Sequence, residues 1–213
     1  MNGLSKIKSD ADVYKLYRGA NRDLWVAAYD QLRFMPEVAE LSSDKTMLEL
    51  ARKAGIKMPV FAARPILRAD MPSDEKWEFP AHQDYPYNLG SLNCITIWIP
   101  FQDTPLELGA LDVIPGSHLK GYVPAKKGLI IKPETKKFVT MPVKLGQALV
   151  FSQFLHHRSG HNRSEQVRFS LQVRFNDLAS REYAKRKYYV NQKVSEKTLE
   201  PKFKTKFPGV KSV

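Results

Sequence analysis

The sequence has little of what marks a secreted or membrane-inserted protein. Its 213 residues include a single cysteine, Cys94, so no disulfide can form within the chain. No run of about 18 apolar residues is present, which predicts that no helix spans a membrane. The first residues, Met1 to Lys6, lack the apolar stretch of a secretion signal. Together these absences predict a protein of a reducing compartment, most simply the cytoplasm.

What is present indicates one globular domain. The hydrophobic content is 43% and the aromatic content 11%, which suffices for a sizeable core. Cys94 lies in the apolar run that ends at Ile99, so we expect a buried structural cysteine rather than a reactive thiol. We predict a helical part over residues 1–58, a barrel over 59–179 and a basic extension over 180–213.

Positive charge is concentrated at the C-terminal end. The net charge is +12, and residues 180–213 carry ten Lys or Arg against three Asp or Glu, whereas the other 179 residues carry 24 against 19. Such a surplus attracts anionic partners or substrates. The extension contains no recognisable nucleic-acid-reading motif, so we interpret it as a solvated basic segment and do not expect nucleic acid as a partner.

The first third of the chain has helical periodicity. Apolar residues recur at spacings of three, four and seven over residues 11–35, and Pro36 should end or interrupt that pattern. A second helix should begin near Ser43, as an N-cap, and stop at Gly55. These helices carry no obvious chemistry and are expected to buttress the rest.

From Pro59 onward the pattern is that of short strands separated by Gly and Pro. We expect strands over residues 60–68, 92–101, 111–115, 129–132, 137–143, 147–154 and 167–176. Short strands at this spacing are typical of an antiparallel sandwich or barrel.

Two segments far apart carry side chains that bind metals. His82 and Asp84 are two residues apart, so in a strand they would point to the same side. His156, His157 and His161 lie far downstream, and the first two would face opposite ways on a strand. One carboxylate and two imidazoles form the facial triad of non-haem Fe(II) oxygenases. The spacing alone leaves open which downstream histidine would take part.

Five motifs together resemble the phytanoyl-CoA dioxygenase family. In chain order they are His82–Asp84, Trp98–Pro105, Gly109–His118, His157–Asn162 and Arg168. The resemblance runs from about residue 64 to residue 175, roughly half of the chain. It implies a double-stranded β-helix, a jelly-roll barrel that holds iron at its open end. It also implies 2-oxoglutarate as co-substrate and hydroxylation of an unactivated C–H bond of a small molecule by O2.

The resemblance implies His82, Asp84 and His157 as the iron ligands. No catalytic residue is expected beyond these three. Related halogenases lack the carboxylate ligand, so the presence of Asp84 favours oxygen transfer over halogenation.

The resemblance also implies the co-substrate residues. Arg168, eleven residues after His157, would hold the distal carboxylate of 2-oxoglutarate, a role that suits a permanently charged guanidinium. Ser159 and Trp98 match positions that line the same pocket, and Gln83 flanks the metal pair.

Other polar residues nearby are interpreted as structural or peripheral. His118 ends a Pro-Gly-Ser turn, and Asn162 should stabilise a turn. Arg158, Arg163 and Arg174 are interpreted as surface or substrate-side charges.

The substrate is not defined by these motifs. We expect residues 120–140 and 89–93 to form its rim, and the basic balance permits an acyl-CoA, a phosphorylated sugar or another anionic metabolite. One alternative is a non-catalytic metal- or sugar-binding jelly-roll module. Arg168 counts against it, because a structural metal site needs no co-substrate clamp. Another is a demethylase-like oxygenase that uses the basic extension to bind protein or nucleic acid.

Overall fold

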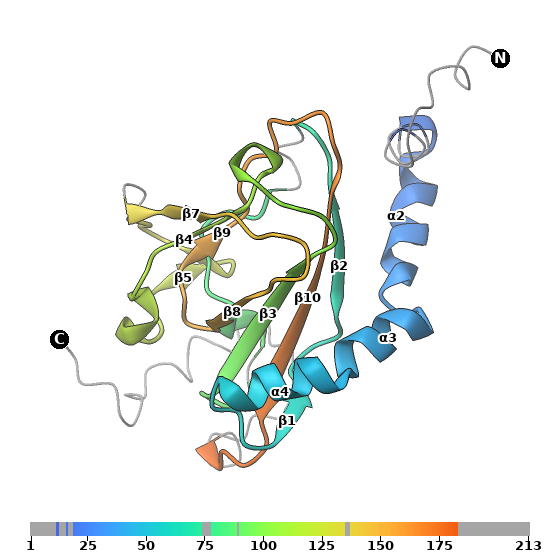
Figure 1. Cartoon of the computed structure of the whole chain (residues 1–213). Coiled ribbons are helices and arrows are strands. Elements are labelled where there is room, and N and C mark those ends of the chain that lie inside the picture. Colours follow the sequence, from blue (N-terminus) through green and yellow to red (C-terminus); the bar gives the residue numbers. More distant parts are fainter. Residues whose placement is uncertain are drawn as a thin grey trace.

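Three helices lie along one side of a body made of short strands (Figure 1). This computed structural model describes residues 19–73, 78–88, 90–134 and 137–182, together with Asp12 and Leu16. The helices are α2 (Arg22–Leu32), α3 (Pro36–Ser43) and α4 (Lys45–Lys53). Within this part of the chain, none of them has the length and apolar character needed to cross a bilayer. The basic extension beyond residue 182, and most of the helix expected before residue 19, lie outside the described residues.

All strand pairs among the described residues are antiparallel, as predicted, and they form a main sheet, a smaller sheet and a separate hairpin. The main sheet has the order β1-β10-β3-β8, and β2 also pairs with β10. Its strands are β1 (Pro59–Phe61), β2 (Ile66–Asp70), β3 (Cys94–Pro100), β8 (Leu149–Ser152) and β10 (Arg168–Asp177). The smaller sheet has the order β7-β4-β9, made of β7 (Val139–Met141), β4 (Leu111–Val113) and β9 (His157–Arg158). A separate hairpin joins β5 (Ala125–Lys126) to β6 (Leu129–Ile130).

The helix boundaries confirm two expectations and correct one. The helical pattern is interrupted ahead of Pro36, since α2 ends at Leu32 and Pro36 begins α3 at the first position, where its missing N–H costs no hydrogen bond. Ser43 is the last residue of α3, and the cap of α4 is Asp44, whose carboxylate accepts a hydrogen bond of 2.7 Å from the Thr46 N–H. Gly55 follows α4 with a φ of +92°, and here the expected glycine stop is confirmed.

The strand expected over residues 60–68 is broken in two. Phe61 pairs with Phe175 and Ile66 with Gln172, so the four residues 62–65 lie opposite only two residues of β10. Pro65, within this stretch, has no N–H to give to the ladder. The edge of the sheet therefore bulges at 62–65.

The main sheet has an apolar outer face under the helices. Ile97 and Ile95 of β3 and Leu171, Val173 and Phe175 of β10 are at most 5% exposed. They form one cluster with residues of the helical region, namely Val38, Met47, Ala51 and Ile56. Burying a side chain of this size stabilises the fold by about 1.5–3 kcal/mol. The opposite, inner face of β10 is polar, and with Thr96 of β3 it carries the site described next.

Candidate metal centre

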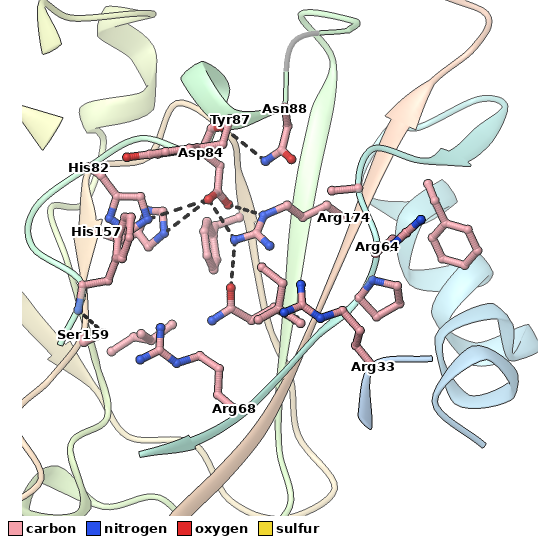
Figure 2. A pocket seen from close by; sticks show the side chains of 18 residues that line it. Arg33, Arg64, Arg68, His82, Asp84, Tyr87, Asn88, His157, Ser159 and Arg174 are labelled. Carbon is pink, nitrogen blue, oxygen red and sulfur yellow. Dashed lines mark hydrogen bonds and ion pairs between the residues drawn. The ribbon is translucent and has the colours of Figure 1, made fainter. Parts of the chain in front are cut away.

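His82, Asp84 and His157 meet inside the barrel (Figure 2). One ligand atom from each lies within 4.8 Å of the others, and all three residues are at most 6% exposed. The Nε2 atoms of His82 and His157 lie 3.8 and 3.9 Å from the same oxygen, Oδ1 of Asp84. The structure therefore brings together the three residues that the resemblance implies as iron ligands.

The backbone fixes the two histidines as a pair. The His82 N–H donates to the carbonyl of His157 at 3.0 Å, and the His157 N–H donates back to His82 at 3.1 Å. The Nδ1 atoms lie 2.8 Å from the Pro80 carbonyl and 3.0 Å from the Leu155 carbonyl. Since a carbonyl can only accept, each Nδ1 carries the proton, which leaves both Nε2 lone pairs free for a metal.

Asp84 lies at a bend just before a short 3-10 helix (Tyr85–Tyr87) rather than in a strand. Arg174 donates to both of its oxygens, Nε to Oδ2 and Nη2 to Oδ1, each at 2.9 Å. The Thr96 hydroxyl donates to Oδ2 as well. Thr96 and Arg174 are direct cross-strand partners on β3 and β10, so the inner face of the main sheet holds this carboxylate in place.

Electrostatics favour the protonation states that a metal requires. Burial alone would raise the pKa of Asp84, but Arg174 and then His157 lower it well below its ordinary value. Burial lowers the pKa of His82 and of His157, against the opposing effect of Asp84. At neutral pH the site therefore offers one carboxylate and two neutral imidazoles.

A cavity of about 960 Å³ opens beside the triad. The rings of Phe79, Tyr87 and Phe151 surround the metal-binding end, with Phe79 and Phe151 centroids 4.3 and 4.8 Å from the His82 and His157 rings. Four arginines also line the cavity: Arg33, Arg64, Arg68 and Arg174. Asp84 is the one acidic residue among the described lining residues.

Ser159 lies in the cavity wall, next to the histidines. Its hydroxyl accepts a 3.0 Å hydrogen bond from the Phe79 N–H. The following glycine, Gly160, packs so closely on Ala110 that a Cβ there would lie 1.9 Å from the Ala110 carbonyl oxygen. The segments 109–118 and 157–162, both part of the resemblance, are therefore in direct contact.

Arg168 and Trp98 lie deeper, behind the cavity wall, and both are at most 1% exposed. The Arg168 guanidinium carbon lies 5.9 Å from the centroid of the Trp98 ring, and Nη2 pairs with Asp70 at 2.8 Å. Arg168 Nε and Nη1 and Trp98 Nε1 are buried donors without a hydrogen-bond partner among the described residues. Buried donors are normally satisfied, so these three N–H groups are available to an acceptor placed beside them.

Gln83 makes structural contacts only, as far as the described chain shows. Its amide donates to the carbonyls of Gly121 and Phe154 and accepts from the Val123 N–H, at 2.7 to 3.0 Å. It does not line the cavity. It ties the loop after residue 120 to the segment that carries Asp84.

Of the three downstream histidines, only His157 belongs to the described triad. His161 bonds Glu78 through Nδ1, and His156 lies beside the site with its backbone N–H on the Ser117 hydroxyl. His118 is exposed and plays no part in the cavity. Asn162 bridges the carbonyls of Asp70 and Gln166 and so stabilises a turn, as predicted.

Arg174 lines the cavity, in agreement with a substrate-side charge, but its pairing with Asp84 was not predicted. Arg158 pairs with Asp112 outside the cavity and Arg163 is exposed, but Arg174 is buried against Asp84. A signal was available in β10, where the even-numbered residues are all polar and the odd-numbered ones all apolar from 169 to 175: Arg168, Ser170, Gln172, Arg174 and Asn176 alternate with Phe169, Leu171, Val173 and Phe175. That pattern predicts one polar face on β10, and in the structure this face points into the barrel, where Gln172 and Arg174 line the cavity.

The expected rim also differs from the observed one. Neither 120–140 nor 89–93 contributes a described residue to the cavity lining. The wall opposite the histidines comes from Arg33 and from residues 61–68, which include the bulge at 62–65.

Comparisons with known proteins agree with this geometry. The family model described as Phytanoyl-CoA dioxygenase (PhyH) matches residues 17–170. A methylphosphonate hydroxylase of Gimesia maris is 31% identical over 120 residues, 55% of this chain and 46% of that protein. The dioxygenase lolE1 of Epichloe uncinata is 30% identical over 101 residues, 43% of this chain and 40% of that protein. The chain thus spans less than half the length of these curated relatives.

A solved structure supports the fold. The epimerase SnoN, in complex with Fe3+, alpha ketoglutarate and nogalamycin RO, superposes with a TM-score of 0.58 at 20% identity, over 79% of this chain and 76% of that one. The mainly-β jelly roll with flanking helices is therefore confirmed.

Proposed function

Because the chain belongs to the phytanoyl-CoA dioxygenase family, we propose that it is a Fe(II)- and 2-oxoglutarate-dependent dioxygenase that hydroxylates a small metabolite. The observation that carries the proposal is the buried triad of His82, Asp84 and His157, with both Nε2 atoms turned toward one carboxylate oxygen. Two imidazoles and one carboxylate suit non-haem Fe(II) and leave coordination positions open.

Residues of the inner face would hold the metal ligands ready. Arg174 and Thr96 fix the Asp84 carboxylate, and the Pro80 and Leu155 carbonyls fix the two imidazoles. Preset ligands of this kind raise metal affinity, because little ordering remains to be done on binding.

The orphan donors behind the cavity fit 2-oxoglutarate. Arg168 would hold the distal carboxylate through Nε or Nη1, and Trp98 Nε1 would donate to the same group. Asp70, shared between Arg68 and Arg168, keeps the guanidinium in place. Ser159 would line the same route between this clamp and the metal.

When bound, Fe(II) with 2-oxoglutarate supplies the oxidising power to insert one oxygen atom of O2 into a C–H bond, with succinate and CO2 as co-products. The protein contributes position and exclusion of water. Phe79, Tyr87 and Phe151 wall the metal-binding end. Asp84 occupies the place that a halide would need, which favours hydroxylation.

The substrate we propose is a small anionic molecule that enters the arginine-lined cavity. One relative is a methylphosphonate hydroxylase, and a phosphonate is such an anion. We place the reaction in the cytoplasm, where a buried free thiol such as Cys94 stays reduced.

An anaerobic titration of the purified protein with Fe(II), then with 2-oxoglutarate, tests the proposal. The expected result is the weak visible metal-to-ligand charge-transfer band. Iron binding without the band would favour a non-catalytic metal-binding module, and no iron binding would refute the triad.

Arg168→Ala tests the co-substrate clamp separately. It should leave Fe(II) affinity unchanged and weaken 2-oxoglutarate about 10- to 100-fold, the loss expected for a charged hydrogen bond. Asp70 keeps Arg68 as a partner in this variant, so the fold should survive. Unchanged 2-oxoglutarate affinity would mean that the co-substrate binds elsewhere.

A further inference from the structure

We infer that Arg33 and Arg64, at the end of the cavity opposite the histidines, form an oxyanion site for a phosphoryl or carboxylate group of the substrate, with Arg68 on the adjoining wall. Figure 2 shows Arg33 and Arg64 on the far side of Arg174 from His82 and His157. The inference rests on the proposed function, since it names the substrate class of that same site.

The charge balance of the cavity is the first ground. Four arginines line it: Arg174 pairs with Asp84, Arg68 with Asp70 and Arg33 with Asp30, and Arg64 has no acidic partner among the described residues. A divalent metal at the triad would add further positive charge. An anionic ligand would relieve this surplus.

Arg64 is the strongest candidate for direct contact. Its guanidinium carbon lies 4.6 Å from the centroid of the Phe34 ring, and no acidic side chain pairs with it in the part of the chain that the structure describes. Contact with the ring restrains the guanidinium, and no hydrogen bond from its N–H groups is found among the described residues. A fixed planar fork of this kind suits the oxygens of a carboxylate or phosphoryl group.

The other two arginines have local acidic partners that orient them. Arg33, just after α2, bonds Asp30 one helical turn away, and Arg68, on β2, bonds Asp70. Both still line the cavity. The three therefore come from separate elements: the end of α2, the bulge at 62–65 and the inner face of β2.

This site differs from the proposed co-substrate clamp. Arg168 and Trp98 do not line the cavity, whereas Arg33, Arg64 and Arg68 do. A cavity of about 960 Å³ lies at the upper end of small-molecule pockets, which span roughly 300–1,000 Å³. It can hold a substrate with its anionic head at the arginines and a C–H group toward the metal.

The test is anaerobic calorimetric titration of the Fe(II)- and 2-oxoglutarate-loaded protein with four probes. Ethylphosphonate and propionate carry the two candidate oxyanions on the same ethyl group, and diethyl ethylphosphonate and propionamide are their neutral counterparts. We expect at least one acid to bind and its neutral counterpart not to bind. Tighter binding of ethylphosphonate would identify a phosphoryl head, and tighter binding of propionate a carboxylate; either supports the inference.

Variants then locate the binding. Arg64→Met should weaken the bound acid about tenfold or more, as expected for loss of a charged hydrogen bond, and Arg33→Met should weaken it less. Arg52→Met, on the exposed surface of α4 and outside the cavity lining, is the matched control and should bind as the wild type does. Arg68 is left intact because its loss would strip buried Asp70 of one partner.

The outcomes separate this inference from the proposed function. Equal binding of acid and neutral probe, or unchanged affinity in both Arg64→Met and Arg33→Met, overturns the oxyanion site while the charge-transfer band still supports the dioxygenase. If the band is absent, the proposed function fails, and titration of metal-free protein still decides whether the arginines bind an oxyanion.

Discussion

The two faces of the β3–β10 pair differ in composition although they belong to the same two strands. On the outer face Ile97, Leu171 and Val173 are fully buried under the helices. On the inner face Thr96 and Arg174 are equally buried, yet they are polar and hold Asp84. Since side chains alternate along a strand, a shift of one residue would exchange the two faces.

The comparison teaches how stability and chemistry divide within one sheet. Apolar burial on the outer face stabilises the fold and fixes the register. The inner face carries a cost, because buried charges are stable only when paired and hydrogen-bonded. The Arg174–Asp84 pair meets that condition. Arg168 pairs with Asp70 but leaves Nε and Nη1 without a hydrogen-bond partner among the described residues, and Trp98 likewise leaves Nε1. A ligand bound beside Arg168 and Trp98 would accept hydrogen bonds from these N–H groups.

The largest expected effect is on the inner face. Asp84→Ala should abolish Fe(II) binding, because it removes the only carboxylate of the triad, as judged by the anaerobic titration. Asp112→Ala is the control, since Asp112 is buried and paired with an arginine but lies outside the cavity. Wild-type iron affinity in Asp84→Ala would show that the metal does not bind at this face.

The outer face should respond in stability instead. Leu171 is 0% exposed, so Leu171→Ala should lower the free energy of unfolding by about 2–5 kcal/mol in urea titrations. The folded fraction should bind Fe(II) normally. Leu145→Ala, at a leucine that is 62% exposed, should change stability by no more than about 0.5 kcal/mol. Loss of iron affinity without loss of stability in Leu171→Ala would contradict the division between the faces.

The outer face was largely predictable from sequence, and so was the triad. The β-branched and aromatic content of residues 92–101 located β3 to within two residues at either end, and the strand expected over 167–176 lies within one residue of β10 at either end. His82 and Asp84 were predicted from their spacing, but only the family resemblance singled out His157 among three nearby histidines. Burial and the backbone bridge to His82 give the physical reason for that choice.

What escaped prediction depends on tertiary contacts. Arg174 was interpreted as a surface or substrate-side charge, but its pairing with Asp84 was not predicted, because that partner lies 90 residues away in the sequence. The bulge at 62–65 arises from pairing with β10, which no local pattern encodes. The N-cap was misplaced by one residue because Ser43 and Asp44 are both good caps.

Arg174→Met sharpens the comparison, since it removes an inner-face charge and leaves all three proposed metal ligands unsubstituted. Asp84 would lose its two-pronged partner, and Fe(II) affinity should fall about 10- to 100-fold, the usual range for partners of metal ligands. Arg158→Met removes the partner of Asp112 outside the cavity and should leave iron binding unchanged. Arg174→Lys should restore part of the affinity, because it returns the charge but not the two-pronged geometry. Equal iron affinity in Arg174→Met and the wild type would reduce Arg174 to a packing role.

The smallest effect should appear when metal-free protein is titrated with acid. Burial lowers the folded-state pKa of His82, His157 and His156 below the ordinary value of about 6.5. Below about pH 6.5 the unfolded chain therefore binds protons that the folded chain refuses, and stability is lost as pH falls. Each histidine contributes at most about 1.4 kcal/mol per pH unit. The outer face has no titratable group in its described cluster, so Leu171→Ala should shift the whole curve without changing its slope. Urea unfolding at pH values between about 5 and 8 measures this dependence. His157→Phe should make the free energy of unfolding depend less steeply on pH. An equal dependence in that variant would show that His157 binds its proton as readily in the folded chain as in the unfolded one.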